Sequence, residues 1–193
     1  INPLRAQFIQ ARVPGGVAAK RVLDVGCGGG ILAEALAEMG ANVTAIDLAS
    51  GPLSVARIHS QRTGVDVHYE LISTEDLAER EPGAYDIVTC LEMLEHVPHP
   101  AAIVTACSRL AKSTGHLFFS TISRNPKAYL FAVIGAEYLL GLLPRGTHDY
   151  AKFIRPSELD SFARRGGLAL RELTGMHYNP LTARYWLGPG VSV

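Results

Sequence analysis

The sequence predicts an α/β protein whose mostly parallel sheet is covered by helices on both faces. Short apolar segments alternate with helical ones along the first two thirds of the chain, and a glycine-rich turn follows the first apolar segment. Strands that alternate with helices at this spacing normally form right-handed crossovers within one parallel sheet. We therefore expect a doubly wound sheet of seven strands, of which the last is antiparallel.

The elements of this pattern follow from apolar runs and from the residues that interrupt them. Five segments are predicted strands: Arg21–Val25, Asn42–Asp47, Val67–Ile72, Tyr85–Leu91 and Leu117–Ile122. Helices are predicted over 1–14, 31–39, 52–61 and 156–165, with Gly40 ending the second and Pro52 in the first turn of the third. Two further strand-like runs, Leu168–Thr174 and Arg184–Leu187, suit an antiparallel hairpin at the sheet edge.

Composition limits the class of protein. The chain has 193 residues of which 48% are apolar, enough for one core and short for two, so we expect a single domain over 1–193. Its 18 basic and 18 acidic side chains cancel without long runs of either sign, so nucleic acid is not an expected partner. Cys27, Cys90 and Cys107 lack CxxC spacing, which favours free thiols in a reducing compartment.

The glycine turn, Gly26–Gly30, suggests a ligand that approaches the backbone closely. The dinucleotide fingerprint would require a third glycine at Ile31, which disfavours a nicotinamide dehydrogenase. An acid-x-Gly-x-Gly-x-Gly pattern fits instead, and it makes Asp24, Gly26 and Gly28 candidate cofactor-binding residues. A turn rich in glycine for packing alone is the alternative.

This pattern resembles the first motif of the class I S-adenosylmethionine-dependent methyltransferases. Their methyl donor has no pyrophosphate, but its aminoacyl tail, sulfonium and ribose can lie across a glycine turn. Asp47 ends the second predicted strand about twenty residues beyond the turn, at the sheet edge where such folds bind ligands. Its carboxylate can accept both ribose hydroxyls, and the alternative is a helix cap or a solvated turn.

Acidic residues and a histidine follow the fourth predicted strand. If the chain becomes helical after Leu91, then Glu92, Glu95 and His96 lie on one helix face. Such a group can deprotonate a hydroxyl, or hold a divalent cation that lowers the pKa of that hydroxyl. Magnesium, manganese and zinc remain open. His148 is a further candidate base, and a helix start with solvated acids is the alternative.

An insertion over 125–151 breaks the alternation of strands and helices. Between Ala128 and Leu143 the only charged residue is Glu137. A helix of that length spans about 24 Å, which is too short to cross a bilayer. We expect a lid that lies on a membrane surface, or alternatively a cap packed on the domain. Three cations that could meet anionic headgroups flank it: Arg124, Lys127 and Arg145.

Several longer motifs together resemble the ubiquinone-biosynthesis O-methyltransferases. They are LDVGCGGG, LEMLEHV, GTHDYAKFI with the following RPSEL, GMHYNP and LGPGV, and they cover nearly the whole chain. The resemblance implies a class I methyltransferase (Rossmann-like) fold with a lid insertion after the fifth strand. It also implies methyl transfer from S-adenosylmethionine to a hydroxyl of polyprenylated catechol and hydroxyquinol intermediates.

The resemblance also implies site residues, partners and a location. Four residues match the family's cofactor contacts: Arg5, Gly26, Asp47 and Leu91, the last of which is commonly methionine in the family. Glu92, Glu95 and His96 match positions proposed to bind a divalent metal such as Mg²⁺ in eukaryotic relatives. We expect a cytoplasmic protein on the inner face of the bacterial membrane, with the lipid surface and a ubiquinone-biosynthesis complex as partners.

Two other functions stay open at this point. One is a carbon-methylating enzyme of quinone biosynthesis, which would act on a ring carbon instead of an oxygen. The other is a membrane-surface protein that binds the cofactor without turnover. Product analysis separates the first from an O-methyltransferase, and release of S-adenosylhomocysteine separates the second.

Overall fold

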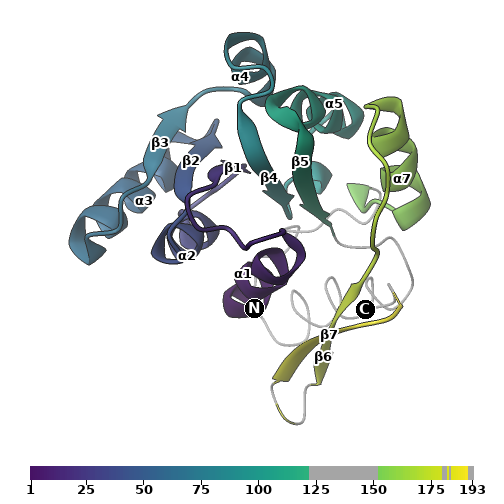
Figure 1. Ribbon diagram of the computed structural model, residues 1–193, viewed down its shortest axis with the longest axis horizontal. Helices are drawn as coiled ribbons and strands as arrows, with labels where there is room; N and C mark the ends of the chain where they lie inside the picture. The colour runs from purple at the N-terminus through teal and green to yellow at the C-terminus, as the bar shows by residue number, and fades with distance from the viewer. Residues whose placement is uncertain (122–151, 180–181, 183, 191–193) are drawn as a thin grey trace.

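A computed structural model describes residues 1–121, 152–179, 182 and 184–190 of the chain. Its central sheet has five parallel strands in the order β3-β2-β1-β4-β5 (Figure 1). The strands are β1 (Arg21–Val25), β2 (Asn42–Asp47), β3 (His68–Leu71), β4 (Tyr85–Leu91) and β5 (Ala111–Ser120). The predicted α/β fold with a parallel sheet is confirmed.

Helices cover both faces of this sheet and divide the core in two. One group contains α1 (Asn2–Arg12), α2 (Ile31–Glu38) and α3 (Ser50–Thr63), and the other contains α4 (Thr74–Arg80), α5 (Pro100–Leu110) and α7 (Pro156–Arg165). Side chains of β1 alternate between the two: Val22 packs with the first group, whereas Leu23 and Val25 pack with the second. The buried part of this strand, Val22–Val25, is therefore apolar except for Asp24, and the exposed Arg21 lies at its start.

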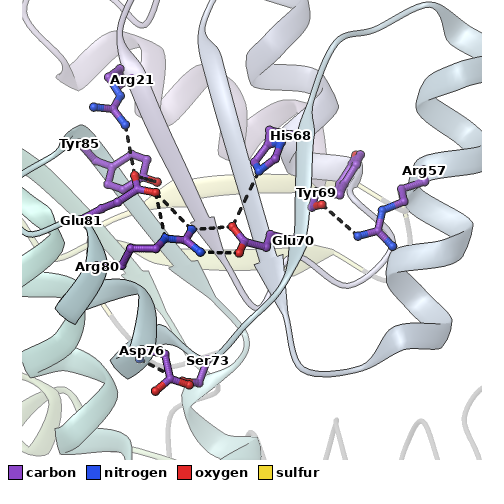
Figure 2. Close-up of polar contacts among 10 residues, drawn as sticks. All are labelled: Arg21, Arg57, His68, Tyr69, Glu70, Ser73, Asp76, Arg80, Glu81 and Tyr85. Atoms are coloured by element: carbon purple, nitrogen blue, oxygen red, sulfur yellow. Dashed lines mark hydrogen bonds and ion pairs between the residues drawn. The ribbon is translucent and has the colours of Figure 1, made fainter.

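A network of charged side chains fastens α4 to the sheet (Figure 2). The Arg80 guanidinium makes two contacts of 2.6 Å with the carboxylate of Glu70 on β3, and a third of 3.1 Å with Glu81. Glu81 also accepts a hydrogen bond of 3.0 Å from the Tyr85 hydroxyl at the start of β4. The hydrogen bonds from Arg80 lower the pKa of Glu70. This network supports the fold and does not include the glycine turn.

The end of the chain differs from the prediction. Residues 168–174 form no strand, and β6 (Gly175–Asn179) pairs instead with β7 (Arg184–Gly188) in a separate antiparallel sheet. The described central sheet therefore has five strands and not the seven expected. Cross-strand aromatic pairs hold the hairpin together: His177 stacks on Trp186 at 5.3 Å between ring centroids, and Tyr178 lies 4.5 Å from Tyr185.

Contacts outside any sheet explain why the predicted strand over 168–174 does not form. The Glu172 carboxylate pairs with both ends of the Arg12 guanidinium on α1, at 2.6 and 2.8 Å. Leu170 and Leu173 are more than half exposed, so these apolar residues pack on no neighbouring strand. The apolar run at 168–174 therefore forms an irregular connection that contacts α1, and not a strand.

The insertion 125–151, with its predicted lid, lies outside the described residues. Of the helices that are described, none combines the length and the apolar content that spanning a bilayer requires.

Candidate active site

The glycine turn connects β1 to α2 at the carboxyl edge of the sheet. Gly26, Gly28 and Gly30 have φ values of +70°, +53° and +78°, a region that other residues rarely adopt. A Cβ on Gly26 would lie 2.5 Å from Cγ of Met93, and one on Gly30 would collide with the Tyr69 hydroxyl. A Cβ on Gly28 would meet nothing within 4 Å. The turn is thus packed at its two ends and open in its middle, where a ligand can approach the backbone.

Asp47, the last residue of β2, holds the open part of this turn. Its Oδ2 accepts a hydrogen bond of 2.9 Å from the Gly28 N–H, and its Oδ1 accepts one of 2.8 Å from the Ala49 N–H. Each carboxylate oxygen retains another lone pair, so both can accept a hydroxyl of a ligand. Leu48, which is 74% exposed beside this carboxylate, adds an apolar surface that the sequence analysis missed.

Asp24 lies behind the turn, inside the sheet. Its side chain is 3% exposed, and its Oδ1 accepts a hydrogen bond of 2.7 Å from the Thr89 hydroxyl on β4. Burial raises the pKa of Asp24 to about 7, although the Thr89 hydrogen bond acts in the opposite direction. The charges of Asp47 and Arg5 also act on this pKa, with opposite signs. Asp24, a residue predicted to bind the cofactor, is therefore a buried acid of β1 whose side chain is hydrogen-bonded to β4.

Arg5 brings a positive charge from α1 to the same edge. The helix is placed by a hydrogen bond of 2.9 Å from the Asn2 side chain to the Ile31 carbonyl. The Nη2 of Arg5 lies 3.0 Å from Oε1 of Glu92. Its Nε is buried and has no hydrogen-bond partner in the part of the chain that the structure describes. Because a buried guanidinium N–H without an acceptor is costly, this atom marks a place where a carboxylate fits well.

Glu92 follows β4 in an unusual backbone conformation. Its φ is +54°, and it is one of two non-glycine residues with positive φ among those described. Its Oε1 accepts a hydrogen bond of 2.6 Å from the Ser120 hydroxyl, and its N–H donates to the Ser120 carbonyl at 3.0 Å. The helix predicted after Leu91 is therefore not formed, because the left-handed residue turns the chain away. Only Leu94–His96 form one turn of 3-10 helix.

The predicted metal-binding trio is consequently not assembled. Glu95 is 4% exposed and accepts a hydrogen bond of 3.1 Å from the Thr121 hydroxyl, whereas the neighbouring His96 is exposed. Among the described residues, no group of three His, Cys, Asp or Glu side chains is arranged to hold a metal ion. His148 lies outside the described residues.

Side chains from five elements thus meet at one edge of the sheet. The predicted residues found there are Arg5, Asp24, Gly26, Gly28, Asp47, Leu91 and Glu92. The open glycine backbone, the remaining lone pairs of Asp47 and the Nε of Arg5, which has no hydrogen-bond partner among the described residues, suit a ligand that carries hydroxyls and a carboxylate. Thr89 and Ser120 were missed, and the only signal for them is a hydroxyl near the carboxyl end of a predicted strand.

Comparisons with known proteins identify the class. Residues 4–173 match the family described as Methyltransferase domain. Magnesium protoporphyrin IX methyltransferase from Synechocystis PCC 6803, solved with bound S-adenosylmethionine, superposes with a TM-score of 0.66 at 18% identity over 95% of this chain and 74% of that one. The [4+2]-cyclase SpnF superposes at 0.65 with 18% identity over 89% and 57%. These structures show the fold, and the domain match makes the chain a methyltransferase.

Relatives in sequence narrow the class further. The chain is 60% identical over 194 residues to the ubiquinone biosynthesis O-methyltransferase of Acinetobacter baumannii strain AYE, which covers all of this chain and 81% of that protein. It is 60% identical over 193 residues to the protein of that name from Pseudomonas aeruginosa strain UCBPP-PA14, with coverages of 100% and 82%. The chain therefore belongs to the ubiquinone biosynthesis O-methyltransferases, as its motifs predicted.

Proposed function

We propose that this O-methyltransferase acts on a phenolic hydroxyl of polyprenylated catechol and hydroxyquinol intermediates of ubiquinone biosynthesis. The names of its relatives support the pathway, and its motifs support the acceptor class. The single observation that supports the chemistry is Arg5, whose guanidinium pairs with Glu92 while its charge acts on Asp24 behind the glycine turn. A site for the methyl donor and a carboxylate for the acceptor are therefore neighbours.

The donor side would bind S-adenosylmethionine through three groups of this chain. When bound, the donor supplies a methyl group on a positively charged sulfur, which an attacking oxygen can displace. The remaining lone pairs of Asp47 would accept the ribose hydroxyls, and the Nε–H of Arg5 would donate to the carboxylate of the aminoacyl tail. Gly28 leaves the backbone accessible.

On the acceptor side, Glu92 is the group that we assign to the acceptor hydroxyl. Its Oε1 accepts a hydrogen bond from Ser120 and forms an ion pair with Arg5, whereas no described residue hydrogen-bonds its Oε2. The side chain is 35% exposed, so Oε2 can accept the phenolic proton as the oxygen attacks the methyl group. Positioning of the two reactants would supply most of the rate. The exposed His96, and His148 outside the described residues, are the other candidate bases.

A methyl-transfer assay on a short-prenyl catechol tests this assignment. Glu92→Gln keeps the size of the side chain but cannot take up a proton, so we expect kcat to fall about 100-fold or more. Mass spectrometry of the product distinguishes a methylated oxygen from a methylated carbon. If no catechol yields S-adenosylhomocysteine although the donor binds, the protein is the cofactor-binding protein without turnover. If His96→Ala or His148→Ala loses activity and Glu92→Gln does not, the base is a histidine.

A divalent cation such as Mg²⁺ stays a separate part of the proposal. No group of three ligands for it is arranged among the described residues, and His148 and Asp149 lie outside them. A rate that a chelator lowers and added magnesium restores would support the cation as a cofactor, and a rate that a chelator leaves unchanged would reject it.

We further propose that the protein is a peripheral membrane protein on the cytoplasmic face, where it would meet its polyprenylated acceptor and other enzymes of the pathway. The support is the apolar run from Ala128 to Leu143 and the cations beside it, all of which lie outside the described residues. Flotation with anionic liposomes tests this. Charging Tyr129, Leu130 and Phe131 should reduce flotation and spare donor affinity, and unchanged flotation would remove the membrane contact.

A further inference from the structure

Ser120, the last residue of β5, holds Glu92 at two points. The Ser120 carbonyl accepts the Glu92 N–H at 3.0 Å, and the Ser120 hydroxyl donates to Glu92 Oε1 at 2.6 Å. One residue therefore fixes both the backbone and the carboxylate of the other. No feature of the local sequence around position 92 would produce this arrangement, because the two residues are 28 positions apart.

The backbone of Glu92 shows why such support is needed. With φ at +54°, this residue has a left-handed conformation that L-amino acids with side chains disfavour. Conformations of this kind persist only where the surrounding contacts over-determine them, and they cluster at functional sites. The contacts here are the two from Ser120 and the ion pair of 3.0 Å with Arg5.

The side-chain contacts of the Glu92 carboxylate are made through one of its two oxygens. Both side-chain partners, Ser120 and Arg5, contact Oε1, while Oε2 has no hydrogen-bond partner among the described residues. A carboxylate that is held through one oxygen cannot rotate freely, so the other oxygen keeps a fixed place. The Nε of Arg5 has no partner among the described residues and is assigned to the donor, so Arg5 does not serve Glu92 alone.

We propose that Ser120 is a positioning residue for methyl transfer, which fixes Glu92 so that Oε2 meets the acceptor hydroxyl. Thr121, the next residue, donates a hydrogen bond from its hydroxyl to the buried Glu95. The hydroxyls of two consecutive residues therefore bind the partly exposed Glu92 and the buried Glu95. The inference rests on the proposed function, because it assigns Oε2 of Glu92 to the acceptor.

The test compares three variants in the same methyl-transfer assay. Ser120→Ala removes the hydroxyl, Ser120→Thr keeps it, and Ser54→Ala removes a serine hydroxyl that bonds only the Ser50 carbonyl on the exposed side of α3. We expect kcat to fall about tenfold in Ser120→Ala, in line with loss of a hydrogen bond to a charged group, with donor affinity unchanged in calorimetry. Ser120→Thr should retain most of the rate, and Ser54→Ala should match the parent enzyme.

A second background shows whether Ser120 acts through Glu92. When Glu92→Gln is already present, Ser120→Ala should lower kcat little further, because the positioned oxygen no longer takes up the proton. An equal loss in both backgrounds would overturn the inference, and so would an unimpaired Ser120→Ala enzyme. If Ser120→Ala does not fold, Ser120→Cys, which is close in size and a weak donor, takes its place with the same expected loss. A parent enzyme that methylates no catechol would reject the proposed function itself, which is a different result.

Discussion

The donor side and the acceptor side of this site are held by different kinds of contact. On the donor side, the glycine turn is fixed by its own backbone and by the neighbouring strand β2, through the Ile46 carbonyl, which accepts from the Gly26 and Cys27 N–H groups, and through the Asp47 carboxylate. On the acceptor side, Glu92 is fixed by side chains from the distant α1 and β5. The donor side should therefore tolerate changes elsewhere in the fold, whereas the acceptor side should respond to whatever moves α1 or β5.

The largest expected effect tests the buried acid behind the donor side. The pKa of Asp24 is raised to about 7 in the folded protein, so the folded state holds this proton more tightly than the unfolded state. The contribution of Asp24 to stability should therefore be largest below about pH 4 and should fall as the pH rises from about 4 to 7, by a total on the order of 4 kcal/mol. Asp24→Asn, which keeps an oxygen for Thr89, should abolish this slope in urea unfolding measured across that range.

Glu70 is the matched control for this pH dependence. Its pKa is lowered by Arg80, so its contribution to stability is present above the ordinary glutamate pKa and is lost as the pH falls further into acid. Glu70→Gln should therefore change the acid end of the curve and leave the slope between pH 4 and 7 in place. If Asp24→Asn and the parent protein gave parallel curves, the buried acid would have no such role.

The next effect tests whether the turn is held by its packed ends. Gly30→Ala would place a methyl group against the Tyr69 hydroxyl at a φ of +78°, so we expect a loss of about 2 kcal/mol or more in unfolding free energy. Gly29→Ala is the control, because its methyl would meet nothing within 4 Å and its φ is not positive. If the two variants lost equal unfolding free energy, the stability of the turn would depend on glycine flexibility and not on the packing of its ends.

The smallest expected effect concerns Asp47, whose carboxylate binds the glycine turn and is proposed to bind the donor. Asp47→Ala should weaken donor binding about tenfold or more, because it removes the hydrogen bond to Gly28 and, under the proposed function, the acceptor of the ribose hydroxyls. Isothermal titration calorimetry measures this directly. Asp66→Ala, an exposed acid beyond the end of α3, is the control and should bind the donor normally. An unchanged dissociation constant for Asp47→Ala would separate this residue from the donor.

The sequence was informative wherever structure depends on neighbours in the chain. Each predicted strand of the central sheet was found, with ends within a few residues except at β5, which begins at Ala111 and not at Leu117. The positive φ angles of the glycine turn follow from residue type alone. Asp47 could be placed beside that turn because parallel strands end at a common edge.

The sequence was least informative where distant residues determine the geometry. Spacing alone favoured a helix through Glu92, Glu95 and His96, but contacts with Arg5 and Ser120 stabilise a left-handed residue there. No local pattern could reveal those partners, since they belong to other elements. An antiparallel hairpin was predicted and its second strand was found at Arg184–Gly188, but its first strand is Gly175–Asn179 and the hairpin is separate from the central sheet. Local sequence could not indicate this, because the pairs that stabilise the hairpin connect two strands across a turn.

One feature of that hairpin makes the protein easy to observe. Trp186 is the only tryptophan of the chain, it is 47% exposed, and it stacks on His177. Its fluorescence therefore reports on one place, the β6–β7 hairpin, without any label. An apolar tail that settled against this indole would shift its emission to shorter wavelength, whereas donor binding alone would leave the colour of the emission as it was. Phenols with prenyl chains of different length can be titrated while the emission wavelength is recorded. The shortest chain that shifts the emission would show which prenyl length is needed to contact the hairpin.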